Sequence, residues 1–493
     1  MINKIKQQLR GTNPGLQSRT VTAALWSLIG SGGAGIIRFA SNLVLTRLLF
    51  PEAFGLMAAA MLSMTLVQTF SDTGVKTALI QHPKGDTPAF IDTSFLIALG
   101  RSVILFVVLI LSINTIANFY DQIELIPILW VMSLAFLAEG FLNPALPLLI
   151  KKLRIENQVI YSVGTQLAGF LTTLILVFSL RSVLALALGY VLTSAYRVFG
   201  SYLVIAYRPR FKWNREAGTA LLHFGKYIIL NTMIGWAVFN ADRMAIGKLL
   251  GMEQLGYYNI ALFIGVFISD VLVQVFSQSY FPAVSSISHQ LAKVQAVFEK
   301  ANSTIIALVA PFIMLLVLFS SEVIEILYDP RYALAGTALF WISLRSLIQV
   351  VNNIQSGTLL ALGRPALVTV ANGIGLAFLA VALPYFTTNF GLTGSGLAVV
   401  LSSLIIGVVQ SMSMIHYANF KARIVLAPWF QLISIMFIMT LIHRLLTGSF
   451  QIFNDYNLSL IILMAVLAGC MSLISIWWLN KRTFSIKVAV EGV

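Results

Sequence analysis

Long apolar stretches separated by short polar ones run along almost the whole chain. A membrane-spanning helix needs about 20 consecutive apolar residues, and cutting the chain at its charged, proline and glycine breaks leaves about fourteen segments of that length. The sequence therefore predicts an all-α polytopic membrane protein, with loops too short to hold a soluble domain. The expected spans cover residues 22–48, 52–80, 92–118, 124–149, 157–179, 182–206, 219–247, 254–281, 296–319, 334–361, 366–387, 392–417, 426–446 and 457–479.

The composition supports this class of protein. Of the 493 residues, 58% are hydrophobic and only 10% are charged, which is too apolar for a soluble domain of this size. Residues 1–19 are basic and polar, and the apolar segment after them is too long for the core of a cleavable signal peptide. We therefore expect that segment to be the first transmembrane helix.

The basic residues lie in alternate loops. A formal net charge of +14 could by itself suggest a nucleic-acid partner, but this alternation is the positive-inside pattern of a multi-pass protein. It predicts that both termini lie in the cytoplasm and argues against a nucleic-acid partner. The loops expected on the cytoplasmic side carry Lys4, Lys6, Arg10, Arg19, Lys84, Lys151, Lys152, Arg154, Arg208, Arg210, Lys212, Arg215, Lys293, Lys300, Arg364, Lys421, Arg423, Lys481, Arg482 and Lys487.

Cysteine and histidine give no support to metal or redox chemistry. A single cysteine, Cys470, excludes an internal disulfide and a thiolate cluster. The five histidines have no HxxxH or HExxH spacing. No metal, cofactor or catalytic residue is expected.

One short segment occurs twice. Residues 48–56 and 249–257 both read LLxxExxG without a gap, each after a long helix with an interior arginine. Six expected helices separate the copies, so the two halves would share one orientation, as parallel repeats do. We expect two six-helix lobes, residues 1–210 and 211–420, followed by helices 13 and 14 in residues 421–493. Chance similarity between apolar sequences is the alternative.

Charged residues within the first six spans are the first candidates for a transport site. Arg38 shares a helix face with Ser31, Gly35 and Asn42, and a mid-membrane arginine is costly unless it faces protein or water. For Arg101 and Arg197, lining a cavity and snorkelling to the interface are equally open. Glu139 would neutralise a buried arginine or act as a proton site, and we favour the first.

The span at 219–247 holds three more candidates. Asp242 and Arg243 are adjacent and therefore point about 100° apart, so they do not simply pair with each other. One could hold a neighbouring helix while the other faces a cavity, and Asn240 lies on the same face as Arg243. The span at 334–361 carries the clearest polar stripe, which predicts a cavity lining: Arg345, Gln349, Asn352 and Ser356.

The balance of these charges indicates the kind of cargo. Bases outnumber acids within the spans, and arginine is the preferred partner of phosphate oxygens. The sequence therefore predicts a two-lobed transporter with a basic interior suited to an anion. The bases are Arg38, Arg101, Arg197, Lys226, Arg243 and Arg345, and the acids, which are also the candidate ion-coupling residues, are Glu139, Asp242 and Asp270.

Three segments carry a family resemblance that extends over essentially the whole chain. They are Leu45–Ala58 (LTRLLFPEAFGLMA), Phe70–Gln81 (FSDTGVKTALIQ) and Phe239–Ala261 (FNADRMAIGKLLGMEQLGYYNIA). In their order and spacing the chain resembles Wzx-type polysaccharide flippases of the multidrug/oligosaccharidyl-lipid/polysaccharide exporter superfamily, in the colanic-acid-exporter-like branch.

The resemblance implies an inner-membrane protein with fourteen helices in two lobes around a central cavity. It also implies an undecaprenyl-diphosphate-linked oligosaccharide as cargo, moved from the cytoplasmic to the periplasmic leaflet by alternating access. By position, Arg38 and Arg243 match the cationic residues thought to bind the diphosphate in this family, and Arg345 is added from its stripe. The lipid bilayer, the polysaccharide polymerase and the export machinery are the further expected partners.

Three other functions stay open. A cation-coupled multidrug exporter of the same fold would use Asp242, Asp270 and Glu139 as ion or proton sites. A flippase for a peptidoglycan precursor would share the fold and the anionic cargo. A membrane enzyme that polymerises or ligates glycans usually needs large periplasmic loops, and the short loops expected here argue against one.

Overall fold

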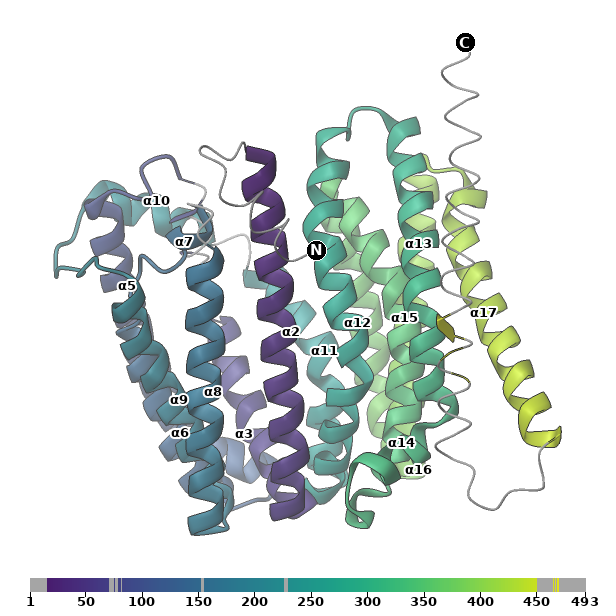
Figure 1. Ribbon diagram of the computed structural model, residues 1–493, viewed down its shortest axis with the longest axis horizontal. Helices are drawn as coiled ribbons and strands as arrows, with labels where there is room; N and C mark the ends of the chain where they lie inside the picture. Colours follow the sequence, from purple (N-terminus) through teal and green to yellow (C-terminus); the bar gives the residue numbers. More distant parts are fainter. Residues whose placement is uncertain are drawn as a thin grey trace, which may run out of the picture. The chain divides into compact units, whose positions relative to one another are not determined.

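The computed structural model describes residues 16–70, 75, 79–80, 82–151, 155–225, 229–449, 464, 466 and 468–469. Over these residues the chain forms fifteen α-helices and one short 3-10 helix, without a β-strand (Figure 1). It divides into two compact units, Met1–Trp236 (unit 1) and Ala237–Val493 (unit 2). The expected all-α class is confirmed, whereas the segment boundaries at residues 210 and 420 stay a prediction.

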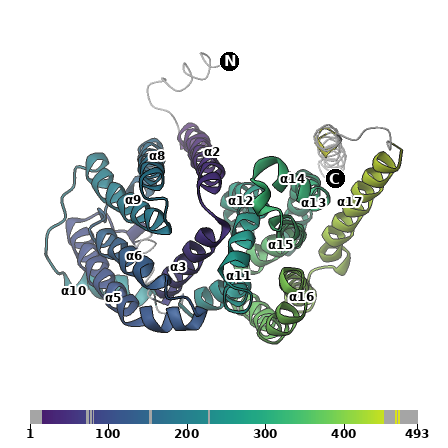
Figure 2. The ribbon, with the colours of Figure 1, turned by 90° about the horizontal axis from the view of Figure 1, so that it is seen from below.

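Unit 1 is a set of helices that pack side by side along their lengths. Helix α8 packs against α2 and α9, and α6 packs against α5 and α9, as the end-on view in Figure 2 shows. The helices are α2 (Leu16–Leu48), α3 (Pro51–Phe70), α5 (Pro88–Tyr120), α6 (Leu125–Gly140), α7 (Leu148–Lys151), α8 (Ile155–Leu180), α9 (Val183–Val204) and α10 (Arg215–Gly225).

Unit 2 is organised around α15, which packs against α12, α13 and α16. Helix α11 (Ile229–Leu249) begins before the unit boundary and ends within unit 2. The others are α12 (Met252–Ser286), α13 (Leu291–Leu318), α14 (Ser320–Leu327), the 3-10 helix η1 (Pro330–Tyr332), α15 (Ala335–Ala361), α16 (Pro365–His416) and α17 (Ala422–Ser449).

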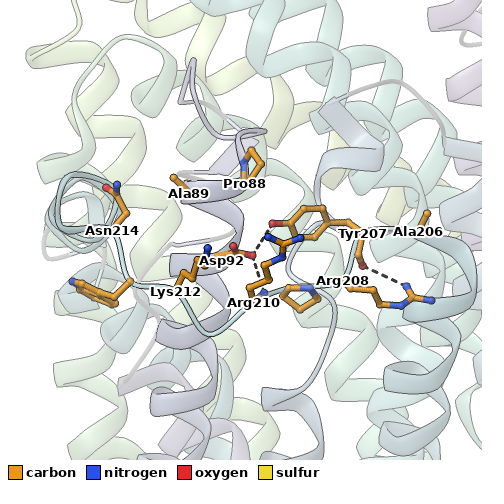
Figure 3. A pocket seen from close by; sticks show the side chains of 11 residues that line it. Pro88, Ala89, Asp92, Ala206, Tyr207, Arg208, Arg210, Lys212 and Asn214 are labelled. Carbon is orange, nitrogen blue, oxygen red and sulfur yellow. Dashed lines mark hydrogen bonds between the residues drawn. The ribbon is translucent and has the colours of Figure 1, made fainter.

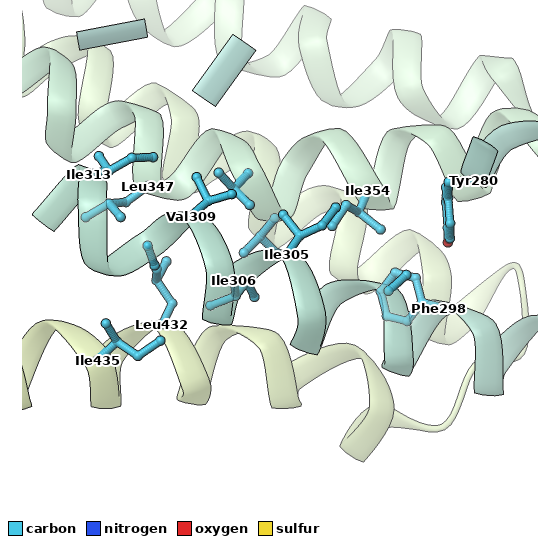
Figure 4. Packing of buried hydrophobic residues seen from close by; sticks show 14 of the residues in the cluster. Tyr280, Phe298, Ile305, Ile306, Val309, Ile313, Leu347, Ile354, Leu432 and Ile435 are labelled. Carbon is cyan, nitrogen blue, oxygen red and sulfur yellow. The ribbon is translucent and has the colours of Figure 1, made fainter. Parts of the chain in front are cut away.

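The core of unit 2 lies where α13 contacts α15 and α17. One face of α13 contributes Ile305, Val309 and Ile313, at the three- and four-residue spacing that brings side chains to one side of a helix. These pack between Leu347 of α15 and Leu432 of α17 (Figure 4). Apolar side chains on one face of each helix therefore hold the unit together.

Glycines allow two helices of unit 2 to approach closely. A Cβ atom added at Gly396 of α16 would lie 2.3 Å from Cβ of Trp341 on α15. Small residues at such crossings let helix backbones pack closely inside a membrane. Gly391 has a positive φ of 59° and marks a kink that divides α16 in two. The sequence predicts this break, with separate spans at 366–387 and 392–417.

The expected spans recur as helices in the expected order. Thirteen of the fourteen segments correspond to long helices of the described chain, with α16 counted as two, and most of the segment at 457–479 lies outside the described residues. Seven described helices are long and apolar enough to cross a membrane. Helix α15 is not among them, because its polar stripe lowers its hydropathy. The chain is a multi-pass membrane protein.

Two helix boundaries differ from the expected spans. The expected span at 219–247 corresponds to α10, which begins at Arg215, and to α11, which ends at Leu249, and residues 226–228 lie outside the described residues. Helix α10 is amphipathic rather than uniformly apolar, so a count of apolar residues alone placed the start of the span at 219. Helix α6 ends at Gly140, several residues before Pro144, where a proline is expected to end a helix early.

The two copies of LLxxExxG form corresponding corners in the two units. Helix α2 ends at Leu48 and α3 begins at Pro51, whereas α11 ends at Leu249 and α12 begins at Met252. The same positions of the repeated segment thus end one helix and begin the next. Gly251 has a φ of 91° in the second corner, a conformation that glycine adopts at little cost.

Candidate functional site

A buried carboxylate joins three helices of unit 2. Asp242 of α11 is 1% exposed, and its Oδ2 lies 3.0 Å from Nη1 of Arg345 on α15. The hydroxyl of Tyr258 on α12 donates to the same oxygen at 2.7 Å. The backbone N–H of Arg243 donates to Oδ1 at 2.8 Å. Asp242 therefore holds a neighbouring helix, as one of the two sequence alternatives predicts.

Arg345 is almost as deeply buried as its partner. Its side chain is 8% exposed, and its guanidinium carbon lies 5.5 Å from the centre of the Phe239 ring. A buried ion pair of this kind is tolerated because each charge compensates the other. In this structure the guanidinium of Arg345 faces the carboxylate and the aromatic ring.

Arg243 differs from Arg345 in having no acidic partner among the residues that the structure describes. Its Nη2 donates to Oδ1 of Asn240 one turn earlier on α11, and its Nε is buried without a hydrogen-bond partner. No carboxylate among the described residues pairs with its guanidinium, and the side chain is half-buried. Because the Asp242–Arg345 pair is neutral as a whole, Arg243 gives this cluster its net positive charge.

The polar stripe of α15 forms hydrogen bonds to neighbouring helices. The amide of Asn352 donates to the backbone oxygen of Ser403 on α16 at 2.8 Å, and Gln410 of α16 donates to the hydroxyl of Ser356 at 2.8 Å. Gln349 donates to Asn353 on its own helix at 3.1 Å. Helix contacts thus account for much of a stripe that the sequence assigns to a cavity lining, and substrate contact by Gln349 and Asn352 stays a prediction.

A second ion pair lies in unit 1. Nη1 of Arg197 on α9 lies 2.7 Å from Oε1 of Glu139 on α6, with 43% and 28% of the two side chains exposed. The hydroxyl of Tyr161 donates to the backbone oxygen of Arg197. Glu139 thus pairs with an arginine, as the favoured interpretation expects, although this arginine is partly exposed and not buried; a role of Glu139 in ion coupling stays a prediction.

The remaining arginines of unit 1 have different surroundings. Nη2 of Arg101 on α5 donates to the backbone oxygen of Gln68 on α3 at 3.2 Å, and the side chain is half-buried. Arg38 of α2 is exposed and forms no hydrogen bond or ion pair with any residue that the structure describes. Lys226 lies outside the described residues, as does the side chain of Asp270 within α12.

Sequence reasoning missed two polar residues that the structure places in helix contacts. Tyr258 completes the shell of Asp242, but a tyrosine in an apolar helix carries no sign of its partner. Asp92 is 4% exposed and accepts hydrogen bonds from the Tyr207 hydroxyl and the Arg210 backbone. Its signal was present, because an acid at the start of a long apolar segment calls for a partner.

Long apolar helices in two units, with a buried ion pair between helices and beside it an arginine that has no acidic partner among the described residues, define a multi-pass membrane protein. The chain belongs to the polysaccharide biosynthesis protein family, whose sequence profile matches residues 44–335. The matched region includes both LLxxExxG corners and Arg243, and it ends at the first residue of α15. The family consists of transporters, so the chain is not an enzyme.

Relatives of known role come from several bacteria. The chain is 23% identical to the lipopolysaccharide biosynthesis protein WzxC of Escherichia coli, over 71% of each chain. It is 21% identical to the succinoglycan biosynthesis transport protein ExoT of Rhizobium meliloti, over 66% of each chain. The teichuronic acid biosynthesis protein TuaB of Bacillus subtilis is 23% identical, over 71% of this chain and 73% of TuaB. The resemblance to polysaccharide flippases is confirmed.

Solved structures show the same fold at low sequence identity. The lipid II flippase MurJ in an inward closed conformation superposes with a TM-score of 0.72 at 13% identity, over 93% of this chain and 99% of MurJ. An outward-facing multidrug transporter of the MATE family superposes with a TM-score of 0.57 at 15% identity, over 87% of this chain and 98% of that transporter. The expected transporter fold is thus confirmed.

Proposed function

We propose that the chain is a flippase that moves undecaprenyl-diphosphate-linked oligosaccharide repeat units across the inner membrane by alternating access. The translocated repeat units would supply the synthesis of a surface polysaccharide. Family membership supports the general role, and relatives are named for lipopolysaccharide, succinoglycan and teichuronic acid. The observation that carries the anionic cargo is Arg243, an arginine without an acidic partner beside a neutral buried pair.

Arg243 is suited to a diphosphate for two reasons. A guanidinium offers several N–H donors in a planar fork that matches phosphate oxygens. No carboxylate among the described residues neutralises this half-buried guanidinium, so its charge is left for an anion. Ion pairing is also stronger in a site that excludes bulk water. We therefore assign the first diphosphate contact to Arg243, with Asn240 orienting its guanidinium.

In the conformation described, Asp242 and Arg345 would position Arg243 and would not themselves contact the diphosphate. Asp242 holds the backbone of Arg243 through Oδ1 and the side chain of Arg345 through Oδ2. The arrangement fixes α11 against α15 and keeps the acid from neutralising Arg243. Arg345 would contact the diphosphate only if another conformation released it from Asp242.

Arg38 is the second candidate for contact with the diphosphate. It is exposed on α2 and has no partner among the described residues, so it too could bind an anion. Arg101 and Arg197 are weaker candidates, because the first donates to a backbone oxygen and the second is paired with Glu139. Arg38→Ala and Arg243→Ala should each reduce transport, whereas Arg197→Ala should affect it less.

Two of the three candidate ion-coupling acids favour this proposal over a cation-coupled drug exporter, and the side chain of the third, Asp270, lies outside the described residues. Asp242 and Glu139 are both paired with arginines, which leaves neither as an uncompensated negative site for a cation. The experiment below distinguishes the proposed cargo from a drug and from a peptidoglycan precursor. The proposed location is the inner membrane with both termini in the cytoplasm. The polysaccharide polymerase and export machinery would act on the transported units.

The proposal is tested in a strain that lacks the chain. Surface polysaccharide is measured, and lipid-linked oligosaccharides are extracted and quantified. We expect loss of the polymer and accumulation of repeat units on the cytoplasmic leaflet, with both restored by the wild-type chain. Normal polysaccharide with raised sensitivity to cationic drugs would instead indicate a drug exporter. Accumulated peptidoglycan precursor would indicate the other cargo.

A further inference from the structure

A cavity of about 720 Å³ lies at one end of unit 1 (Figure 3). It is formed by the start of α5 and by the linker at 205–214 that connects α9 to α10. Helices α5 and α9 are both apolar enough to span a membrane. The cavity therefore lies where these two spans meet the membrane surface, on the side that the positive-inside pattern assigns to the cytoplasm.

The lining of the cavity is basic. Three cationic side chains, Arg208, Arg210 and Lys212, line it against the single carboxylate of Asp92. Arg208 is partly engaged, because it donates to the backbone oxygen of Ile205 at 2.8 Å and lies over the Tyr202 ring. The side chains of Arg210 and Lys212 form no hydrogen bond or ion pair within the described part of the chain and are exposed.

Asp92 fixes the linker to α5 and is not free to neutralise these cations. Its Oδ1 accepts from the Tyr207 hydroxyl at 2.6 Å and from the Arg210 backbone N–H at 2.9 Å. Burial, and then the hydrogen bond to Asp92, raise the pKa of Tyr207 to about 12. The tyrosine therefore stays a hydrogen-bond donor at physiological pH. The backbone of Asn214 donates to Thr93 at 3.1 Å, which fixes the far end of the linker.

Aromatic residues flank the basic side chains. Phe211 is 71% exposed and Trp213 is 56% exposed, and Trp213 also lines the cavity. Exposed aromatic side chains at the end of a span are typical of the membrane interface. A basic cavity with such neighbours combines a contact for a charged headgroup with a contact for the adjoining acyl chains.

We infer that this cavity binds the phosphate headgroup of an anionic phospholipid, held by Arg210 and Lys212. A volume of this size is within the range of small-ligand sites and suits a glycerophosphate headgroup. The bound lipid would anchor the linker between α9 and α10 at the membrane surface. This role does not depend on the cargo of the transporter.

The test measures which lipids the protein retains. Wild-type protein is incorporated into nanodiscs of phosphatidylcholine with a minor fraction of phosphatidylglycerol, and the lipids that remain bound are identified by native mass spectrometry. We expect retention of phosphatidylglycerol over phosphatidylcholine. The double variant Arg210→Ala, Lys212→Ala should weaken it about tenfold, because each basic residue contributes appreciably to attraction by an anionic leaflet.

Two control variants separate a specific cavity from general charge. Arg364→Ala, Lys421→Ala removes two exposed basic residues from loops expected on the same membrane side and should retain the lipid. Arg210→Lys, Lys212→Arg keeps the charge and should also retain the lipid, which would show that the loss in the alanine variant follows the removal of charge. Equal loss in the Arg364/Lys421 variant would overturn the assignment to the cavity, as would unchanged retention in the alanine variant of the cavity.

A final arm distinguishes the lipid from a soluble anion. Inorganic pyrophosphate is titrated into protein held in phosphatidylcholine nanodiscs. The lipid assignment predicts no saturable binding that depends on Arg210 and Lys212. Saturable binding lost in the alanine variant, without a preference for phosphatidylglycerol, would overturn the lipid assignment and indicate a site for a free or cargo-borne diphosphate.

Discussion

Asp242 and Arg345 form an ion pair across 3.0 Å between α11 and α15, with only 1% and 8% of their side chains exposed. Tyr258 adds a hydrogen bond from α12 to the same carboxylate. Asp242 therefore joins three helices. Its other carboxylate oxygen accepts a hydrogen bond from the backbone N–H of Arg243. Loss of the ion pair should affect both the stability of unit 2 and the position of Arg243.

Removal of the carboxylate should destabilise the protein strongly. Asp242→Ala leaves the guanidinium of Arg345 buried and uncompensated, which typically costs about 3–5 kcal/mol. We expect a clear fall in the thermal unfolding temperature of the purified protein in detergent. The double variant Asp242→Leu, Arg345→Met removes both charges and should recover much of the loss. If Asp242→Ala unfolds at the wild-type temperature, the pair does not hold these helices together.

The ion pair of unit 1 should matter less. Arg197 and Glu139 are 43% and 28% exposed, so neither charge depends on its partner as fully as the buried Asp242 and Arg345 do. Glu139→Gln should therefore change the unfolding temperature only slightly and leave polysaccharide export near the wild-type level. A loss of export without a loss of stability would show instead that Glu139 acts in ion coupling.

Close packing between α15 and α16 gives a third prediction. Gly396→Ala places a methyl group against Cβ of Trp341, at a distance that no relaxed structure keeps, and overpacking costs typically about 1–3 kcal/mol. Gly373→Ala on the same helix meets nothing within 4 Å and serves as the matched control. We expect the first variant to unfold at a lower temperature and the second to be unchanged or slightly more stable, as alanine in a helix usually is. Equal unfolding temperatures would mean that the crossing has room to adjust.

The sequence predicted the positions of the helices better than the contacts between them. Long apolar runs and the break near Gly391 follow from local composition, because each span must satisfy its own backbone in lipid. The start of the span at 219 was misplaced because α10 begins with charged residues at Arg215 and is amphipathic. A count of apolar residues does not find the polar first turn of such a helix.

The sequence does not predict which buried charges pair with each other. Periodicity indicates that Asp242 and Arg243 face different directions, and the structure bears this out. It does not indicate that Arg345, about a hundred positions later in the chain, is the partner of Asp242, because pairing depends on which helices become neighbours. For the same reason the stripe on α15 resembled a cavity lining, although Asn352 and Ser356 bond to α16.

Replacement of Arg243 by lysine should affect transport more than protein stability. Arg243→Lys keeps the charge but loses the planar fork that binds phosphate through two N–H groups. We expect export between that of the wild type and that of Arg243→Ala, with all three proteins present at equal levels in the membrane. Export by Arg243→Lys no better than that by Arg243→Ala would show that charge alone is insufficient, and full export would show that the fork is not needed.

The central claim is that an unpaired arginine in unit 2 binds the diphosphate of a lipid-linked oligosaccharide during its transfer. The most direct measurement is the amount of lipid-linked repeat units on each leaflet in a deletion strain that carries wild-type, Arg243→Ala or Arg364→Ala protein, the last replacing an exposed loop arginine. The account predicts accumulation on the cytoplasmic leaflet with Arg243→Ala, and normal transfer with the other two proteins. Normal transfer with Arg243→Ala at wild-type protein levels would contradict it.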